Sequence, residues 1–310
     1  MVLAAVALAG VKQLFINPFI RHSEPVVSAA EAFDKQGASA AATRYATDYL
    51  SFSPASSAAG AAALHADAAP DSDAGGSRWW QGSGYLRAHT ALPGAVRVVD
   101  TTHALVTVSV RVHVAMPPAK AAAKGPTVPA PVGPAGSAAD PGTVPAGWTD
   151  LGARWLVLTV PVVVGDDGAA SVTGGGAVFT AEAPQVVTAP DGAQNDATLS
   201  RDTQATATTL FSSYARSDVG YVTAPGAKIR GLAGAVTLVG LPQWSTAVPK
   251  PAAGSTAAAA TSATGNGTVT WQLAGTDLQI AQPYALAMAF NENRWYIDRI
   301  GPQLSSTPGL

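Results

Sequence analysis

The chain contains no cysteine and carries little charge. The absence of cysteine from its 310 residues excludes disulfides, thiol catalysis and cysteine-ligated zinc. Charged residues make up 12%, about half the share found in ordinary globular domains. The formal net charge is −2, without the basic stripe that marks nucleic-acid-binding proteins. Direct binding of nucleic acid is therefore not expected.

Apolar residues are plentiful, at 47% of the chain, and the length allows two domains of ordinary size. Residues 1–20 carry one charge, Lys12. Their uninterrupted apolar part, 1–11, is shorter than the roughly 20 residues that cross a bilayer, and no basic residues precede it as in a signal peptide. We expect 1–20 to be part of a membrane anchor whose cytoplasmic start is missing, or else a buried helix. The anchor would make this a single-pass protein of the cytoplasmic membrane with its domains on the extracytoplasmic side.

The first half predicts an α+β domain over residues 26–182. Apolar residues recur at helical spacing over 26–52, where Gly37 indicates a break between two helical pieces. Strand patterns follow, and the clearest is 104–114, with valines on one face and Thr, Ser, Arg and His on the other. The further strands are expected at 95–101, 154–164 and 170–180. A Pro-, Ala- and Gly-rich stretch at 116–147 predicts a disordered insertion.

The second half repeats this plan. A linker is expected at 183–197, then a domain at 198–301 with a disordered insertion at 250–267, then a tail at 302–310. A helix around 207–215 precedes strands at 235–241, 268–273, 284–290 and 294–300. No helices fall between strands, which disfavours a parallel sheet. The prediction is a duplicated α+β domain, each copy a curved antiparallel sheet packed on N-terminal helices.

Several segments together resemble a known family. They are an apolar start, the helix containing "RYATDYLSF", then "WWQGSGYL", "AVTLVGLPQW", "TVTWQLAGTDLQ" and the closing "YALAMAFNENRWYIDRI". This order resembles the actinobacterial conjugal transfer proteins of the TcpC type, from about residue 32 to residue 301. The resemblance implies two tandem cystatin- or nuclear-transport-factor-two-like cones outside the membrane, similar in fold to the bitopic scaffold subunit of type IV secretion systems. The short anchor and the two long insertions depart from the family.

The residues suggest no strong catalytic or metal site. None of the five histidines has metal-ligand spacing. His113 lies two residues from Arg111 on the polar face of its strand, and with Asp100 these side chains could form a small polar site. A solvated or partner-facing surface is the favoured alternative. Asp218 is interpreted as a helix-terminal residue, and the glycine run 174–176 as a bulge, because no helix follows it. We expect no catalytic residues, cofactor or metal.

The tryptophans are the best candidates for an interface. Trp79 and Trp80 lie in a glycine-flanked stretch, where they could anchor a partner or plug the open end of their own sheet. Trp244 is a similar case. By contrast, Trp155, Trp271 and Trp295 are expected in the core. The predicted interface residues are therefore Trp79, Trp80, Trp244, Arg111 and His113.

Three functions remain open. The first, favoured by the resemblance, is a membrane-anchored scaffold of a conjugative DNA-transfer apparatus, not an enzyme. Its partners would be other subunits of the membrane complex and further copies of this chain. The second is an isomerase- or dehydratase-like or ligand-binding cone, which requires a deep cavity with ionisable side chains. The third is an accessory protein of cell-envelope transport.

Overall fold

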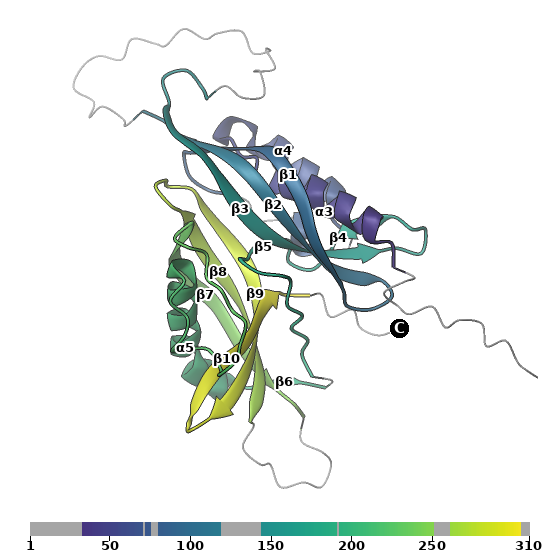
Figure 1. The fold of residues 1–310 in the computed structure, drawn as a ribbon, viewed down its shortest axis with the longest axis vertical. Helices are drawn as coiled ribbons and strands as arrows, with labels where there is room; N and C mark the ends of the chain where they lie inside the picture. Colours follow the sequence, from purple (N-terminus) through teal and green to yellow (C-terminus); the bar gives the residue numbers. More distant parts are fainter. Residues whose placement is uncertain are drawn as a thin grey trace, which may run out of the picture.

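The computed structural model describes residues 33–70, 72–75, 80–118, 144–190, 192–250 and 261–304. In this part of the chain two antiparallel sheets each pack on a helix (Figure 1). The first half holds α3 (Lys35–Tyr49), η1 (Pro54–Ser56), α4 (Ser57–Asp67), η2 (Asp73–Gly75), β1 (Tyr85–Val98), β2 (His103–Met116), β3 (Thr149–Val164), β4 (Ala170–Val172) and β5 (Val178–Phe179). The second half holds β6 (Gln194–Asn195), α5 (Ala197–Arg216), β7 (Val236–Val248), β8 (Ser262–Leu273), β9 (Gln279–Asn291) and β10 (Arg294–Pro302). The predicted α+β class is confirmed.

The first sheet has the order β1-β2-β3-β4, and β5 also pairs with β3. The alternating pattern of β2 produces two different faces. Its valines are fully buried against α3, whereas Arg111 is exposed and Thr107, Ser109 and His113 are partly exposed. Helix α3 supplies Tyr45, Tyr49 and small alanines to the same core. We call the face of this sheet turned away from α3 the open face.

The second sheet has the order β10-β9-β8-β7-β6. Its inner face packs on α5, with a core of Phe211, Trp271 and Tyr284, whose rings lie 5.2–6.1 Å apart. Helix α5 begins after Asp196, whose carboxylate accepts hydrogen bonds from the backbone N–H groups of Thr198 and Leu199. Such an N-cap satisfies donors that the helix cannot pair internally.

Three local predictions need correction. Gly37 does not break a helix, because α3 starts at Lys35 and Gly37 donates its N–H to the Asp34 cap in the first turn. The part of the predicted helix before residue 33 lies outside the described residues. Strand β8 begins at Ser262, so residues 262–267 of the second predicted insertion are paired with β9, and residues 264–267 are also paired with β7. Met116, placed in the first insertion, ends β2 and pairs with Thr149.

The two long connections also lie at different places in the two sheets. In the first sheet the connection follows the second long strand, β2, whereas in the second sheet it follows the first long strand, β7. The predicted common plan therefore holds for the helix followed by antiparallel strands, but not for the position of the long loop.

None of the helices in residues 33–304, apart from the undescribed gaps, is long and apolar enough to cross a membrane. The longest of them, α5, has 20 residues and contains Arg, Asp, Gln and several Thr and Ser side chains. This finding contradicts the predicted localisation as a single-pass protein of the cytoplasmic membrane, which we withdraw. The segment expected to be the anchor, 1–20, lies outside the described residues.

The residues predicted as the linker, 183–197, are fixed to the second half at several points. The Gln185 amide donates to the Lys228 carbonyl at 2.5 Å, and the Arg299 guanidinium donates to the Val186 carbonyl at 3.1 Å. Val187 is buried. At the end of the segment, β6 pairs with the end of β7. The connection is thus part of the second domain's packing.

Candidate interaction surface

Trp80 does not face a partner. Its indole N–H donates to the Tyr49 carbonyl at 2.8 Å, and its side chain is buried. Its ring lies 6.2 Å from the Phe179 ring. Of the two predicted alternatives, the structure therefore supports the plug of its own sheet, and the interface role of Trp80 is wrong. Trp79 lies outside the described residues.

Trp244 lies partly buried on β7. Its indole N–H donates to the Thr203 hydroxyl at 3.1 Å. Its ring occupies the space above Gly265 and Gly267, where an added Cβ would lie 2.1 Å and 2.8 Å from ring atoms. Trp244 also lines a cleft of about 510 Å³ with Asp73 and Gln303. Its ring is mainly engaged inside the second domain.

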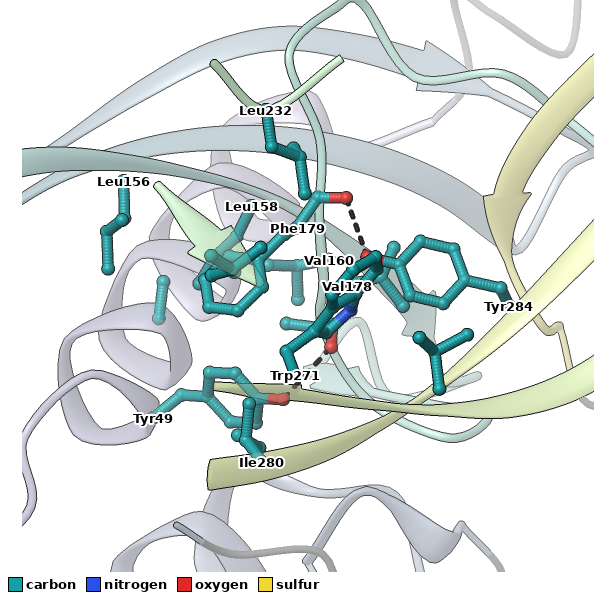
Figure 2. Packing of buried hydrophobic residues seen from close by; sticks show 14 of the residues in the cluster. Tyr49, Leu156, Leu158, Val160, Val178, Phe179, Leu232, Trp271, Ile280 and Tyr284 are labelled. Carbon is teal, nitrogen blue, oxygen red and sulfur yellow. Dashed lines mark hydrogen bonds between the residues drawn. The ribbon is translucent and has the colours of Figure 1, made fainter. Parts of the chain in front are cut away.

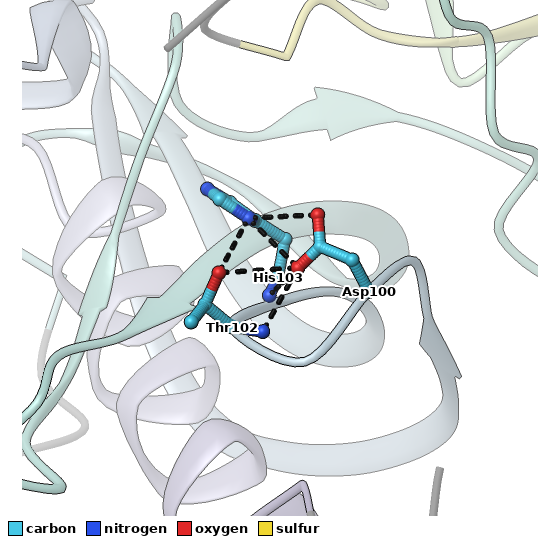
Figure 3. Close-up of polar contacts among 3 residues, drawn as sticks. All are labelled: Asp100, Thr102 and His103. Atoms are coloured by element: carbon cyan, nitrogen blue, oxygen red, sulfur yellow. Dashed lines mark hydrogen bonds and ion pairs between the residues drawn. The ribbon is translucent and has the colours of Figure 1, made fainter. Parts of the chain in front are cut away.

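The predicted trio of Asp100, Arg111 and His113 is not brought together. Asp100 lies in the turn between β1 and β2, where it accepts hydrogen bonds from Thr102 and His103 (Figure 3). Partial burial alone would raise the pKa of Asp100, but these hydrogen bonds hold it below its ordinary value. His113 lies near the other end of β2, where its Nε2 is 2.6 Å from the Asp150 carboxylate. Asp100 is therefore a turn residue.

Arg111 and His113 instead belong to a patch on the open face. Strand pairing places Arg111 opposite Thr90 on β1 and opposite Trp155 on β3. Trp155 was expected in the core, but half of its side chain is exposed (50%). The alternation along β3 could have predicted this exposure. Leu156 and Leu158 are buried side chains of β3, and Trp155 points to the opposite face. We define the open-face patch as Arg87, His89, Arg111, His113 and Trp155.

Positive charge gathers in the open-face patch. The His89 and His113 rings lie 5.8 Å apart. Desolvation and the neighbouring His113, Arg87 and Arg111 together lower the pKa of His89. The pKa of Asp150 is lowered by hydrogen bonds from the Gly152 N–H and from His113. Within the described residues neither arginine of the patch forms an ion pair.

The ring of Phe179 in β5 lies 6.2 Å from the Trp80 ring in the first domain. The Phe179 backbone, by contrast, contacts buried side chains of the second domain (Figure 2). Its carbonyl accepts hydrogen bonds from the Tyr284 hydroxyl at 2.9 Å and the Tyr214 hydroxyl at 3.4 Å, and its N–H donates to the Gln282 carbonyl at 3.0 Å. The Gln282 amide donates to the Tyr49 hydroxyl at 3.0 Å. Burial raises the pKa of both Tyr214 and Tyr284.

Two clefts open where the second domain meets the open face. A smaller cleft of about 200 Å³ lies beside Trp155 and is lined mainly by apolar residues, including Val157, Leu232 and Val236. A larger one of about 900 Å³ shares Val157 with it and also contains Glu182. Burial raises the pKa of Glu182, and Arg230 and Lys228 act in the opposite direction.

The other candidates from the sequence do not form a catalytic or metal-binding cluster among the described residues. Among the described residues no group of three or more His, Asp or Glu side chains is placed to hold a metal ion. Asp218 is exposed just beyond α5, and its N–H donates to the Ser213 carbonyl. The glycine run 174–176 forms the turn between β4 and β5, both of which pair with β3.

The geometry defines a two-domain α+β protein with a charged, aromatic patch on its first sheet. No protein-family model and no curated protein matches the chain. Among solved structures, it is similar to one described as an "Ntf2 like protein involved in plasmid conjugation". The identity is 14% and the TM-score 0.32, and the alignment covers 86% of this chain and 96% of that one.

Proposed function

We propose that this protein is a scaffold subunit of a conjugative DNA-transfer apparatus that acts by binding other proteins rather than by catalysis. The observation that carries the binding role is the contact of β5 with the buried polar groups of the second domain. The Phe179 backbone and the Gln282 side chain engage the Tyr214 and Tyr284 hydroxyls of α5 and β9, the groups that would orient a small molecule in a cone-shaped site. The open face of the first sheet, by contrast, remains available to partners.

The assignment to conjugation rests on the resemblance of this sequence to the TcpC type. Several segments from both halves carry that resemblance, from "RYATDYLSF" to "YALAMAFNENRWYIDRI". The partners proposed are other subunits of the apparatus and further copies of this chain. Membrane anchorage forms no part of the proposal.

A mating assay tests this function. Deletion of the gene from the donor should abolish transfer of the conjugative element, and expression of the full chain from a second locus should restore it. Unchanged transfer after deletion would refute the proposal.

A further inference from the structure

The open face of the first sheet combines two features that meet at Trp155. One is the positive charge of the open-face patch. The other is the smaller cleft, whose lining includes the Trp155 side chain itself. The exposed Trp155 thus lies between a cationic cluster and an apolar cleft, and aromatic and arginine side chains are enriched at binding hot spots.

The cationic cluster spans neighbouring strands. Arg87 and His113 are directly opposite each other on β1 and β2, and Arg111 is opposite Trp155 on β3. Asp150 is the one carboxylate in contact with the cluster among the described residues, and it is held by His113 and the Gly152 N–H. The two arginines are therefore available to pair with an external anion.

The cleft beside Trp155 can take an apolar side chain. It lies between β3 and the 231–236 segment of the second domain, and Leu232 and Val236 form its far wall. Thr180 is the single polar residue of its lining. An aliphatic or aromatic group of a partner would bury apolar surface here on both sides, worth roughly 25 cal/mol per Å² removed from water.

The chemistry of the surroundings favours protein over nucleic acid. Trp155 is the one Trp, Tyr or Phe side chain of the open-face patch, whereas proteins that bind single strands stack bases on several such rings. Farther along, the larger cleft contains the Glu182 carboxylate, whose Oε1 lies 4.0 Å from the Arg230 guanidinium. A phosphate backbone that followed this groove would compete with Glu182 for Arg230.

We propose that the open-face patch binds a protein segment that inserts an apolar side chain beside Trp155 and places carboxylates against Arg111 and Arg87. The inference deepens the proposed function and rests on its claim that the protein acts by binding. It names the chemistry of the partner, which is an apolar residue flanked by acidic ones.

Fluorescence polarisation of the full chain with a labelled peptide tests this site. The probe carries a leucine–phenylalanine pair flanked by glutamates. Three further probes replace the glutamates by lysines, replace the apolar pair by alanines, or consist of labelled oligothymidylate. The acidic apolar peptide should bind, and Arg111→Glu and Trp155→Ala should each weaken it by about tenfold or more, which corresponds to losing one hot-spot contact.

Matched surface variants control for charge and exposed apolar area. Arg201→Glu changes an exposed arginine on α5, and Val239→Ala truncates a side chain of β7 that is 49% exposed. Neither should alter binding. Circular dichroism and thermal unfolding of every variant establish that the fold is retained. If Trp155→Ala unfolds the chain, Trp155→Gln and Leu232→Ala provide the same readout from both sides of the cleft.

The pH dependence supplies a second measurement. His89 faces Arg87 on its own strand and Arg111 and His113 on β2, and Asp150 of β3 lies against His113. Because the pKa of His89 is lowered, protonation of its ring adds charge to the patch only as the pH falls below its ordinary range. Binding of the acidic peptide should therefore strengthen mainly as the pH falls below about 6.5, the ordinary pKa of histidine, towards about 5.5, and His89→Gln should reduce this gain.

Four outcomes would overturn the inference. The first is that the acidic peptide does not bind up to about 1 mM, and the second is that the lysine peptide binds equally well. The third is that oligothymidylate binds more tightly than the acidic peptide. The fourth is that Trp155→Ala abolishes self-association of the chain, which would make a second copy the occupant. The mating assay separates this failure from that of the proposed function. Transfer that needs the gene but tolerates Arg111→Glu and Trp155→Ala refutes only the site.

Discussion

Gln282 links the two domains through a buried network of hydrogen bonds. It lies on β9 of the second sheet and is fully buried. Its carbonyl accepts from the Phe179 N–H and the Tyr284 hydroxyl, and its amide donates to the Tyr49 hydroxyl. Both Phe179 and Tyr49 belong to the first domain. A Gln282→Leu substitution keeps similar volume but removes every one of these hydrogen bonds.

The expected cost follows from the groups left without partners. The Phe179 N–H would remain buried and unpaired, which costs about 1–3 kcal/mol, and the loss of the remaining bonds adds about 1 kcal/mol. Gln282→Leu should therefore lower the free energy of unfolding by about 2–4 kcal/mol. Because the lost bonds join the domains, part of this loss should appear in the first domain, far from the substitution in sequence.

Urea unfolding and amide hydrogen exchange measure both parts. Gln282→Leu should speed exchange in α3, which carries Tyr49, as well as in β9. The control is Thr246→Val, which removes a buried hydrogen bond of 2.8 Å to Thr203 within the second domain alone. It should cost about 1 kcal/mol and leave exchange in α3 unchanged. If Gln282→Leu also leaves α3 unchanged, the buried network does not couple the domains and the reasoning fails.

Three further predictions concern single contacts. Gly176→Ala should lower the free energy of unfolding in urea by about 2–4 kcal/mol, because φ is +83° and the new Cβ would lie 2.5 Å from the Tyr45 hydroxyl. The control Gly168→Ala, at φ +78° with nothing within 4 Å of the new Cβ, should cost only about 1–2 kcal/mol. Equal costs would contradict the steric argument. Asp34→Ala should cost about 1 kcal/mol by removing the cap of α3, with faster exchange in its first turn as the check. Partial burial would raise the pKa of Asp277, but hydrogen bonds from Ser83 hold it below its ordinary value; this contribution to stability is present above the ordinary carboxyl pKa and is lost as the pH falls through the lowered value, so Asp277→Asn should flatten the acid limb of a stability-versus-pH curve.

Alternation predicted the buried strands well and the exposed ones poorly. The valines at every second position of β2 predicted both the ends of the strand and which of its faces is buried. Strand β1 was expected only from residue 95, yet it starts at Tyr85, because most of its residues are exposed on the edge of the sheet and Pro93 and Gly94 interrupt the pattern. The second half of β7 was missed for the same reason, since Pro242 and two register shifts break its alternation.

The site was harder to predict than the fold, for a related reason. Trp155 was assigned to the core on its residue type alone, although the phase of Leu156 and Leu158 placed it on the other face. The partner of Trp80 could not be read from local pattern, because Phe179 belongs to a strand of two residues whose contacts are all distant in sequence. Periodicity reports which face of an element is apolar, but not which domain covers it.

The contact between β5 and the second domain bears on how the protein works. Opening the space between α5 and β9 would pull the Phe179 backbone away from Gln282, Tyr214 and Tyr284. The buried polar groups of these side chains would then lose hydrogen bonds, at about 1–3 kcal/mol for each group left unsatisfied. The same contacts fix the first sheet relative to the second, so a partner bound at the open-face patch would be held in a defined orientation to the whole chain. This favours a role in positioning proteins over one that depends on opening the interior.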